Sequence, residues 1–291
     1  MRKSIQNTYN RPCRNPKFMT TKEMFEARDW VKIRNTTTGE QAFLTWSGKV
    51  YAFSPGEPKI HLFNIVGMNV SRCLDNPDKE ESWSFVSREL TYYLDPETDE
   101  ILHSWKNPWT GETVPVMHVA NSPVQGRQPF EGQYGAKVDG DFTTFAFDLF
   151  TSYPNPLGND ERFVEYSPQS LYQAVELFKL TVPTRELRNP ESTSIANVIL
   201  GWDRLGPWVP WMKMGGRAGQ LIYSASGRKL TGFEELPELL QEQIKTRIPA
   251  YRHAPEARIE GDNVTSWRYF KRHFEEYLAG KEFPLTDVEG A

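Results

Sequence analysis

The segment from Tyr92 to Val124 carries the side chains of this 291-residue chain that are best suited to proton transfer. Its apolar runs are separated by two stretches rich in turn-forming residues, 95–100 (DPETDE) and 107–112 (NPWTGE). Such stretches between apolar runs are typical of tight connections between antiparallel strands. The segment is therefore predicted to form two consecutive hairpins.

The register of these hairpins decides which side chains meet. We place Leu94 opposite Ile101 and Trp105 opposite Val114, so that each turn closes symmetrically. Side chains alternate between the two faces of a strand with a period of two residues. Four side chains are then predicted to project from one face: Tyr92, His103, Trp105 and His118.

These four side chains suit general acid–base catalysis. Histidine titrates near neutrality, and a tyrosine hydroxyl can donate a proton or stabilise an oxyanion. His118 is the strongest candidate, because its apolar neighbours oblige it to find a partner or stay neutral. His103 or Tyr92 would be its proton partner. Two alternatives stay open: a mixed face with two ordinary histidines, and a one-residue slip that would bring in Tyr93.

The stretch 202–219 (WDRLGPWVPWMKMGGRAG) is the most aromatic part of the chain. Its two prolines fix the backbone and exclude an interior strand there. A rigid aromatic loop at a barrel mouth suits a pocket for an apolar or aromatic small molecule, with methionine adapting to the ligand's shape. Arg204 would hold a carboxylate or enolate of that ligand, or else pair with Asp203. The other interpretation is a loop that plugs the barrel end. The predicted substrate-binding side chains of this stretch are Trp202, Trp208, Trp211 and Met212.

Several short motifs, taken together, are similar to an uncharacterised domain-of-unknown-function family known from fungi and bacteria. The resemblance covers roughly residues 20–255 and implies no established activity. In fungi such proteins can accompany secondary-metabolite genes, which favours a small organic substrate. It strengthens Arg72, Trp105, His118, Asn121, Trp208 and Trp211 as site candidates, with Arg72 a second cation able to stabilise developing negative charge. The motifs are Trp46-x-Gly-x-x-Tyr51, Ser54-Pro55-Gly56-Glu57-Pro58, Gly67-Met68-Asn69-Val70-x-Arg72, Trp105-x-Asn107-Pro108-x-Thr110-Gly111-Glu112, His118-Val119-x-Asn121-x-Pro123-Val124 and Pro207-Trp208-x-Pro210-Trp211-Met212.

The elements that must position these residues are mainly strands. Aromatic residues make up 13% of the chain, and they favour pleated, half-buried surfaces. Turn signals break the sequence into short apolar runs, including a hairpin over 42–53 that turns at Ser47-Gly48, a long strand over 60–74 with a bulge or bend at Gly67, and a turn at 226–228. The segment 171–182 is assigned as a strand, although its start also suits a helix. The predicted fold is mainly β (α+β): a curved antiparallel sheet or barrel enclosing an apolar cavity, with helices at its ends.

Helical spacing of apolar residues appears near both ends of the chain. It predicts a short helix over 22–34 and two C-terminal helices at about 234–248 and 264–279, the last capped by Gly280. Residues 1–19 read as a flexible N-terminal tail. Residues 20–291 are assigned to a single β-rich domain.

Composition excludes several classes of function. The net charge of −4 and the absence of a basic run argue against nucleic-acid binding. No dinucleotide or P-loop motif and no metal-ligand spacing is present, so neither a cofactor nor a metal is expected. No segment has the length and hydrophobicity of a membrane span or a secretory signal, and there are only two cysteines. These observations predict a cytoplasmic protein, and they leave a homodimer open.

Three functions fit these observations. The first is a cofactor-independent isomerase, cyclase, dehydratase or lyase that acts by acid–base chemistry on an apolar or aromatic small molecule, such as a secondary-metabolite intermediate. The second is a lipocalin-like carrier that only binds such a molecule. The third is an interaction protein that docks through its aromatic loop.

Overall fold

The alternation of apolar and polar residues along the chain produces one long antiparallel sheet. The computed structural model describes residues 21–74 and 82–286. Ten strands pair in the order β1-β8-β9-β10-β11-β12-β2-β3-β4-β7. The strands are β1 (Thr21–Glu26), β2 (Gln41–Phe53), β3 (Ile60–Leu74), β4 (Ser82–Leu94), β7 (Val119–Pro129), β8 (Gln133–Asp139), β9 (Phe142–Pro154), β10 (Leu171–Pro183), β11 (Ile199–Gly206) and β12 (Gln220–Leu230).

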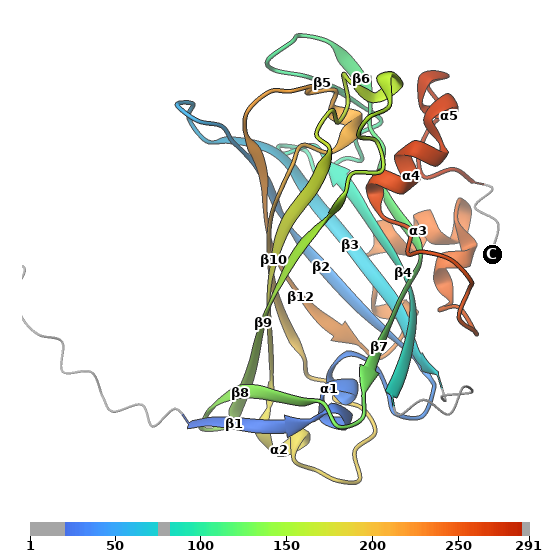
Figure 1. Cartoon of the computed structure of the whole chain (residues 1–291). Helices are drawn as coiled ribbons and strands as arrows, with labels where there is room; N and C mark the ends of the chain where they lie inside the picture. Colours follow the sequence, from blue (N-terminus) through green and yellow to red (C-terminus); the bar gives the residue numbers. More distant parts are fainter. Residues whose placement is uncertain (1–20, 75–81, 287–291) are drawn as a thin grey trace, which may run out of the picture.

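The sheet consists of two meanders that meet in its middle. In the first meander β2, β3, β4 and β7 follow one another, and in the second β8 to β12 do the same. The pairing of β12 with β2 joins them, and β1 adds to the outer side of β8. The strands twist and the sheet curls into a half-barrel (Figure 1). This arrangement confirms the predicted curved antiparallel fold.

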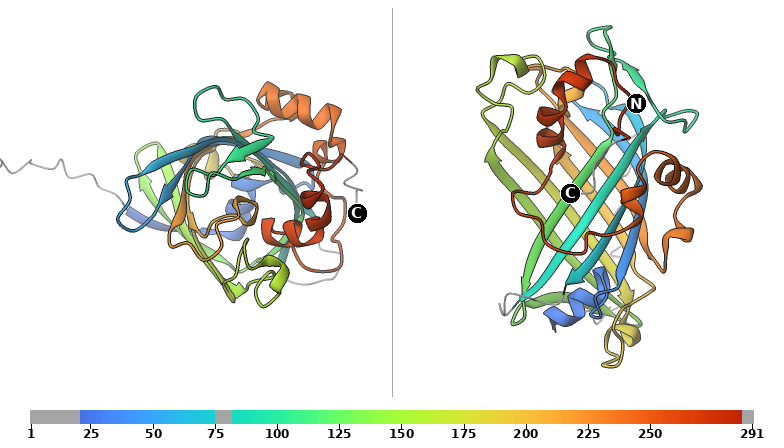
Figure 2. Two further views of the ribbon diagram at one scale, coloured as in Figure 1. Left: turned by 90° about the horizontal axis from the view of Figure 1, so that it is seen from above. Right: turned by 90° about the vertical axis from the view of Figure 1, so that its right-hand side faces the viewer.

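The remaining elements close the ends and the outer side of the sheet. A two-stranded ribbon of β5 (Ser104–Lys106) and β6 (Thr113–Pro115) lies at one end, and α1 (Ala27–Arg34) and α2 (Thr184–Leu187) lie at the other (Figure 1). The C-terminal helices α3 (Glu238–Thr246), α4 (Ser266–Arg272) and α5 (Phe274–Leu278) pack outside the curled sheet, on the side of β4 and β7 (Figure 2). Within the described residues, no helix has the length and hydrophobicity to cross a membrane.

Two apolar clusters fill this framework. The larger one extends from the concave side of the sheet, where Phe63 and Trp211 lie, to the C-terminal helices, where Phe270 lies. The smaller one packs Trp30 of α1 against Phe145 and Leu180 near the opposite end. Burial of aromatic side chains on both sides of β4 explains why this strand has almost no exposed positions.

Two predicted turns are wrong, because their glycines lie inside strands. Residues 42–53 form the single strand β2 rather than a hairpin, and residues 226–228 continue β12. A Cβ on Gly48 would lie 2.2 Å from the Ser224 carbonyl oxygen, and a Cβ on Gly227 would lie 2.0 Å from that of Thr45. These glycines let β2 and β12 approach closely, which the sequence pattern does not distinguish from a turn.

Two further predictions need correction. The predicted helix over 22–34 is helical only from Ala27, because residues 21–26 pair with β8 as β1. The predicted bulge at Gly67 is absent, since the pairing of β2 with β3 stays in register there and shifts instead between Val50 and Tyr51.

Other predictions are confirmed. The segment 171–182 is a strand, β10, and both C-terminal helices are present, the last one split into α4 and α5. The N-terminal tail predicted over residues 1–19 lies outside the described residues.

Candidate functional site

His118 lies in a closed aromatic environment. Its side chain is 1% exposed, and its ring centroid lies 4.6 Å from that of Tyr92 and 6.1 Å from that of Tyr93. Its Nδ1 accepts a hydrogen bond from the backbone N–H of Tyr93 at 3.1 Å, so the ring proton belongs on Nε2. Burial, helped by the positive charges of His103 and Arg247, lowers the pKa of His118 to about 3. The imidazole is therefore neutral at physiological pH.

The predicted register is correct, yet the predicted cluster does not form. Leu94 bridges Ile101 and Trp105 pairs with Val114, as expected. However, β4 ends at Leu94 and the chain leaves the main sheet for the β5–β6 ribbon, so face alternation does not carry over from Tyr92 to His103.

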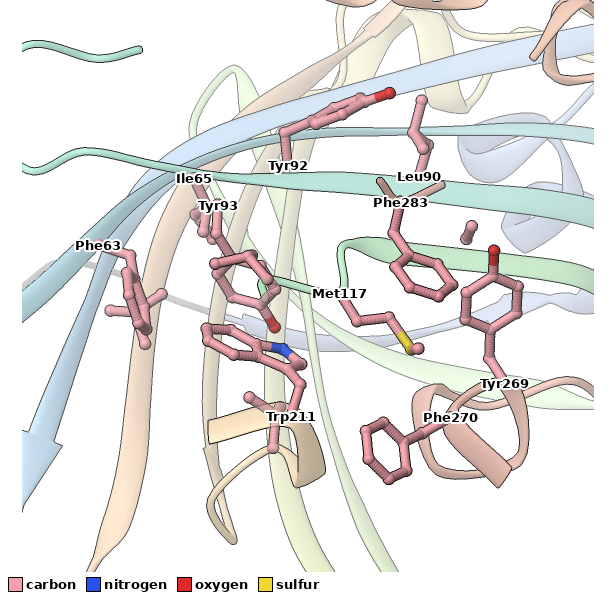
Figure 3. Packing of buried hydrophobic residues seen from close by; sticks show 14 of the residues in the cluster. Phe63, Ile65, Leu90, Tyr92, Tyr93, Met117, Trp211, Tyr269, Phe270 and Phe283 are labelled. Atoms are coloured by element: carbon pink, nitrogen blue, oxygen red, sulfur yellow. The ribbon is translucent and has the colours of Figure 1, made fainter. Parts of the chain in front are cut away.

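His103 lies away from His118, whereas the Tyr92 ring packs against the His118 ring but directs its hydroxyl to another partner. The His103 side chain is 63% exposed, with its Nδ1 3.3 Å from a carboxylate oxygen of Glu282. Tyr92 projects to the outer side of the sheet, and its hydroxyl donates to Oε1 of Gln243 in α3 at 3.2 Å. Figure 3 shows Tyr93 turned toward Trp211 and Tyr92 turned away from it.

The aromatic stretch both plugs the end of the sheet and lines a pocket. Trp211 and Met212 form a buried 3-10 turn, η2 (Pro210–Met212), and the Trp211 ring lies 6.0 Å from that of Trp105 and 5.4 Å from that of Tyr93. Trp208 instead lines a pocket of about 300 Å³ together with residues 215–220, Tyr172 and Trp267. Neither this pocket nor the outer one described below includes His118 among its lining residues.

A different set of polar side chains converges on the concave face. Glu89 lies four residues before Tyr93 in β4, so both side chains share that face. Asn69 of β3 is directly opposite Glu89, and Asn121 of β7 is its partner on the other side. Side chains directly opposite on neighbouring strands are in contact distance. Three polar groups thus form a row across the interior.

Glu89 is the carboxyl group of this row, and its pKa is perturbed. Burial raises its pKa, and the negative charge of Glu176 raises it further, while a hydrogen bond from Asn121 and the charge of Arg34 act in the opposite direction. The amide of Asn121 donates to Oε2 of Glu89 at 3.4 Å. A carboxyl group whose pKa is raised by burial and by a second carboxylate tends to hold its proton near neutrality.

The Glu176 side chain of β10 has partners on two sides. The indole N–H of Trp202 donates to its Oε2 at 2.9 Å, and Nε of Arg204 lies 4.0 Å from its Oε1. The Glu176 side chain is 26% exposed, so it keeps contact with solvent. Trp202 and Arg204, predicted to bind substrate and stabilise charge, therefore both act directly on this carboxylate.

Arg204 is part of a buried network. It donates to the hydroxyl of Tyr172 at 2.9 Å and lies over the ring of Tyr223 at 5.0 Å, and the hydroxyls of Tyr223 and Tyr93 are 3.0 Å apart. The predicted pairing of Arg204 with Asp203 is absent, because consecutive residues of β11 face opposite sides and Asp203 accepts from Ser224 instead.

Arg34 enters the same interior from the end of α1. Its side chain is solvent-accessible, yet burial lowers its pKa and the charge of Glu89 raises it. Lys229 of β12 fixes this end of α1 by donating to the carbonyl oxygens of Lys32 at 2.9 Å and Asn35 at 2.6 Å.

Among the buried polar atoms that lack a partner in the described part of the chain, three belong to side chains in or beside this row. They are the indole nitrogen of Trp46 and the amide oxygens of Asn69 and Asn121, each buried without a hydrogen bond in the described part of the chain. Trp46 is paired with Gly227 on one side and Gly67 on the other, and a Cβ on Gly67 would lie 2.4 Å from the Trp46 indole nitrogen. Gly67 makes room for the indole, and Gly227 lets the backbone of β2 approach β12. Buried polar groups are nearly always hydrogen-bonded, so unpartnered ones indicate a ligand or water position.

We call this set the interior carboxylate site: Arg34, Trp46, Asn69, Glu89, Asn121, Glu176, Trp202 and Arg204. Within residues 21–74 and 82–286, no three His, Cys, Asp or Glu side chains are grouped so as to hold a metal ion. Half-buried Phe147, Phe178, Trp46 and Trp202 supply apolar surface beside the carboxylates.

Sequence reasoning found part of this site and missed the rest. It selected Asn121, Trp202 and Arg204, and it overlooked Glu89 and Glu176. The signal that was available is the position of Glu89, a charged residue directly before the apolar run 90–94 (LTYYL) of the same strand. Trp46 and Asn69 stood in recognised motifs and were not considered as site residues. Arg72, by contrast, faces the outer side of β3 and does not reach this interior.

Comparisons with known proteins identify the family. A model of a family described as "Protein of unknown function (DUF1838)" matches residues 39–274, which include every member of the interior carboxylate site except Arg34. A search of curated proteins gave no match. The chain belongs to the DUF1838 family.

Proposed function

We propose that the concave face of the sheet binds a small, largely apolar organic molecule and that Glu89 transfers a proton to it. The reaction classes that suit such a site are isomerisation, cyclisation and elimination. The observation that carries the proposal is the raised pKa of Glu89, in a row of interior side chains whose two amide oxygens have no partner among the described residues. A carboxyl group whose pKa is raised is a better general acid near neutrality than an ordinary glutamate.

The two carboxyl groups have different environments, which supports different roles. Burial raises the pKa of Glu89. Glu176 instead receives a hydrogen bond from Trp202 and lies near the Arg204 cation. Glu89 would give its proton to an oxygen or a double bond of the substrate, and Glu176 would accept a proton from a neighbouring carbon. Solvent access at Glu176 allows the protons to be exchanged after each turnover.

The other members of the site would orient the substrate. The indole N–H of Trp46 offers a donor and the amide oxygens of Asn69 and Asn121 offer acceptors, so a substrate with one hydroxyl and one carbonyl group is well matched. Trp46, Trp202 and Phe178 would contact its apolar body. Such a combination of apolar surface and few polar groups is usual in small-molecule sites.

Mass spectrometry of co-purifying small molecules tests this proposal. Wild-type protein and the Glu89→Gln variant would be purified from a host that supplies the ligand, and bound molecules would be compared by mass, retention time and fragmentation. Glutamine keeps the size of Glu89 but cannot donate an acidic proton. We expect both proteins to retain a ligand and Glu89→Gln to accumulate an unreacted form, with turnover reduced at least about 100-fold.

The control is Glu242→Gln, which neutralises an exposed carboxylate on α3. It should behave as wild type. If Glu89→Gln retains the same molecule in the same chemical state as wild type, catalysis by Glu89 is refuted and the site is that of a carrier.

A further inference from the structure

A second pocket lies on the outer side of the sheet, away from the interior carboxylate site. It has a volume of about 450 Å³ and lies between strands β3 and β4 and the segment 250–259. That segment runs from η4 (Pro249–Arg252) toward α4, on the outer side of the sheet seen in Figure 2. Its volume falls within the range of ordinary small-molecule sites.

Two arginines on neighbouring strands line this pocket. Arg72 of β3 is paired with Val86 of β4, and Arg88 of β4 is paired with Val70 of β3, so the two guanidinium groups are diagonal neighbours on one face. Arg88 and Glu89 are consecutive and therefore point to opposite faces. The outer pocket and the interior carboxylate site are thus separated by the thickness of the sheet.

Arg88 is held rigidly by protein groups. Its side chain is 7% exposed, its Nε donates to the hydroxyl of Ser122 at 3.2 Å, and its Nη1 donates to the carbonyl oxygen of His253. These acceptors are neutral, so the positive charge of Arg88 is not compensated by a carboxylate.

Arg72 differs from Arg88 because one of its buried nitrogen atoms has no acceptor among the described residues. Its Nε is buried and has no hydrogen-bond partner in the described part of the chain. No ion pair joins Arg72 or Arg88 to a carboxylate within residues 21–74 and 82–286. A buried guanidinium nitrogen without an acceptor is costly, and an anion in the pocket would remove that cost.

The rest of the lining indicates the body of the ligand. Ala250, Ala254, Pro255, Ala257 and Ile259 form a wall of small apolar side chains. Glu256 also lines the pocket, which leaves one positive charge in excess when it is set against the two arginines.

We propose that the outer pocket binds a small organic anion, with its carboxylate or phosphate group on Arg72 and Arg88 and its apolar body against the alanine-rich wall. Arginine binds either group through two parallel hydrogen bonds, and the geometry here offers one free guanidinium beside one that is fixed. This proposal does not depend on the function of the interior carboxylate site.

Isothermal titration calorimetry at low ionic strength tests the pocket with three probes: phenylacetate, phenyl phosphate and inorganic phosphate. We expect one of the two organic anions to bind with 1:1 stoichiometry and inorganic phosphate to bind more weakly than phenyl phosphate. Tighter binding of phenylacetate would identify a carboxylate ligand, and tighter binding of phenyl phosphate a phosphate ester. Equal affinity for the two phosphates would refute a role for the apolar wall.

Variants separate the pocket from general charge attraction. Arg72→Gln should weaken binding of the organic anion roughly tenfold or more, and this variant should fold because Nε of Arg72 has no hydrogen-bond partner to lose among the described residues. Ala257→Phe keeps both charges but fills the pocket, and it should also abolish binding. Arg185→Gln removes one exposed positive charge from α2 and should have no effect. If no probe binds, or if Arg185→Gln weakens binding as much as Arg72→Gln, the proposal is wrong.

Discussion

Ionisation of His118 links the stability of the protein to pH. The folded protein holds this imidazole neutral with a pKa of about 3, whereas an unfolded histidine has a pKa of about 6.5. Between these two values the unfolded chain binds one proton more than the folded chain. Stability contributed by the neutral ring is therefore complete above about pH 6.5 and is lost as the pH falls toward 3.

The variant His118→Asn makes this dependence measurable. Asparagine does not titrate, and its amide oxygen can accept from the Tyr93 N–H in place of Nδ1. We expect urea unfolding of wild type to lose up to about 1.4 kcal/mol per pH unit between pH 6 and 4 relative to His118→Asn. Equal slopes for the two proteins would contradict the buried neutral state. Because only the difference in slope matters, a lower overall stability of the variant does not affect the test.

At the scale of single residues, the sequence could predict that His118 is buried, but it could not identify the proposed proton-transfer group. The apolar neighbours of His118 indicated burial, and burial is what the structure has. The proposed proton-transfer group is instead Glu89, whose pKa depends on Glu176 from another meander. A charge from a strand 87 positions away in the sequence leaves no local signal beside Glu89.

At the scale of elements, glycines determine how closely the strands that position the site residues can approach one another. Gly67 lies where any side chain would collide with the Trp46 indole at 2.4 Å and with the Thr91 hydroxyl at 2.6 Å. We expect Gly67→Ala to displace Trp46 from its position between β12 and β3 and to cost about 1–3 kcal/mol, as overpacking does. Urea unfolding measures the stability, and ligand retention measures the effect on the interior carboxylate site.

Gly126→Ala is the matched control. It also lies in a strand, β7, but a Cβ at this position would meet no atom within 4 Å. Its stability should stay within about 0.5 kcal/mol of wild type. If both glycine variants behave alike, the close contact between Gly67 and Trp46 does not matter for the fold.

The errors in element prediction have the same origin. Gly48, Gly67 and Gly227 read as turns or a bulge in the sequence, because a glycine between apolar runs most often breaks a strand. Here each permits a close approach to a neighbouring strand. Only the pairing of β2 with β12 on one side and with β3 on the other reveals this, and the pairing with β12 joins distant parts of the chain. Turns at 95–100 and 107–112, in contrast, depend on local residues and were predicted correctly.

At the scale of the whole molecule, the interior carboxylate site belongs to neither meander alone. Trp46, Asn69, Glu89 and Asn121 come from the first meander, and Glu176, Trp202 and Arg204 come from the second. The sequence predicted the curved sheet and its helices because composition and turn spacing act throughout the chain. It could not predict the site, because the site exists only where the two meanders meet.

The seam between β12 and β2 also determines when the protein can fold during synthesis. Phe53 pairs with Gln220 and Phe43 with Leu230. The strand β12, which is the second neighbour of β2, is therefore synthesised only after most of the chain. Such distant pairing is slow, and an unpaired strand edge is open to wrong partners. We expect ribosome-arrested chains that stop before residue 220 to be cleaved by protease along β2, and chains long enough to release Leu230 to be protected. Protection of the shorter chains would show that the first meander folds by itself. Until β12 emerges, a nascent chain would depend on chaperones to shield β2, which makes translation speed over the second meander a determinant of yield.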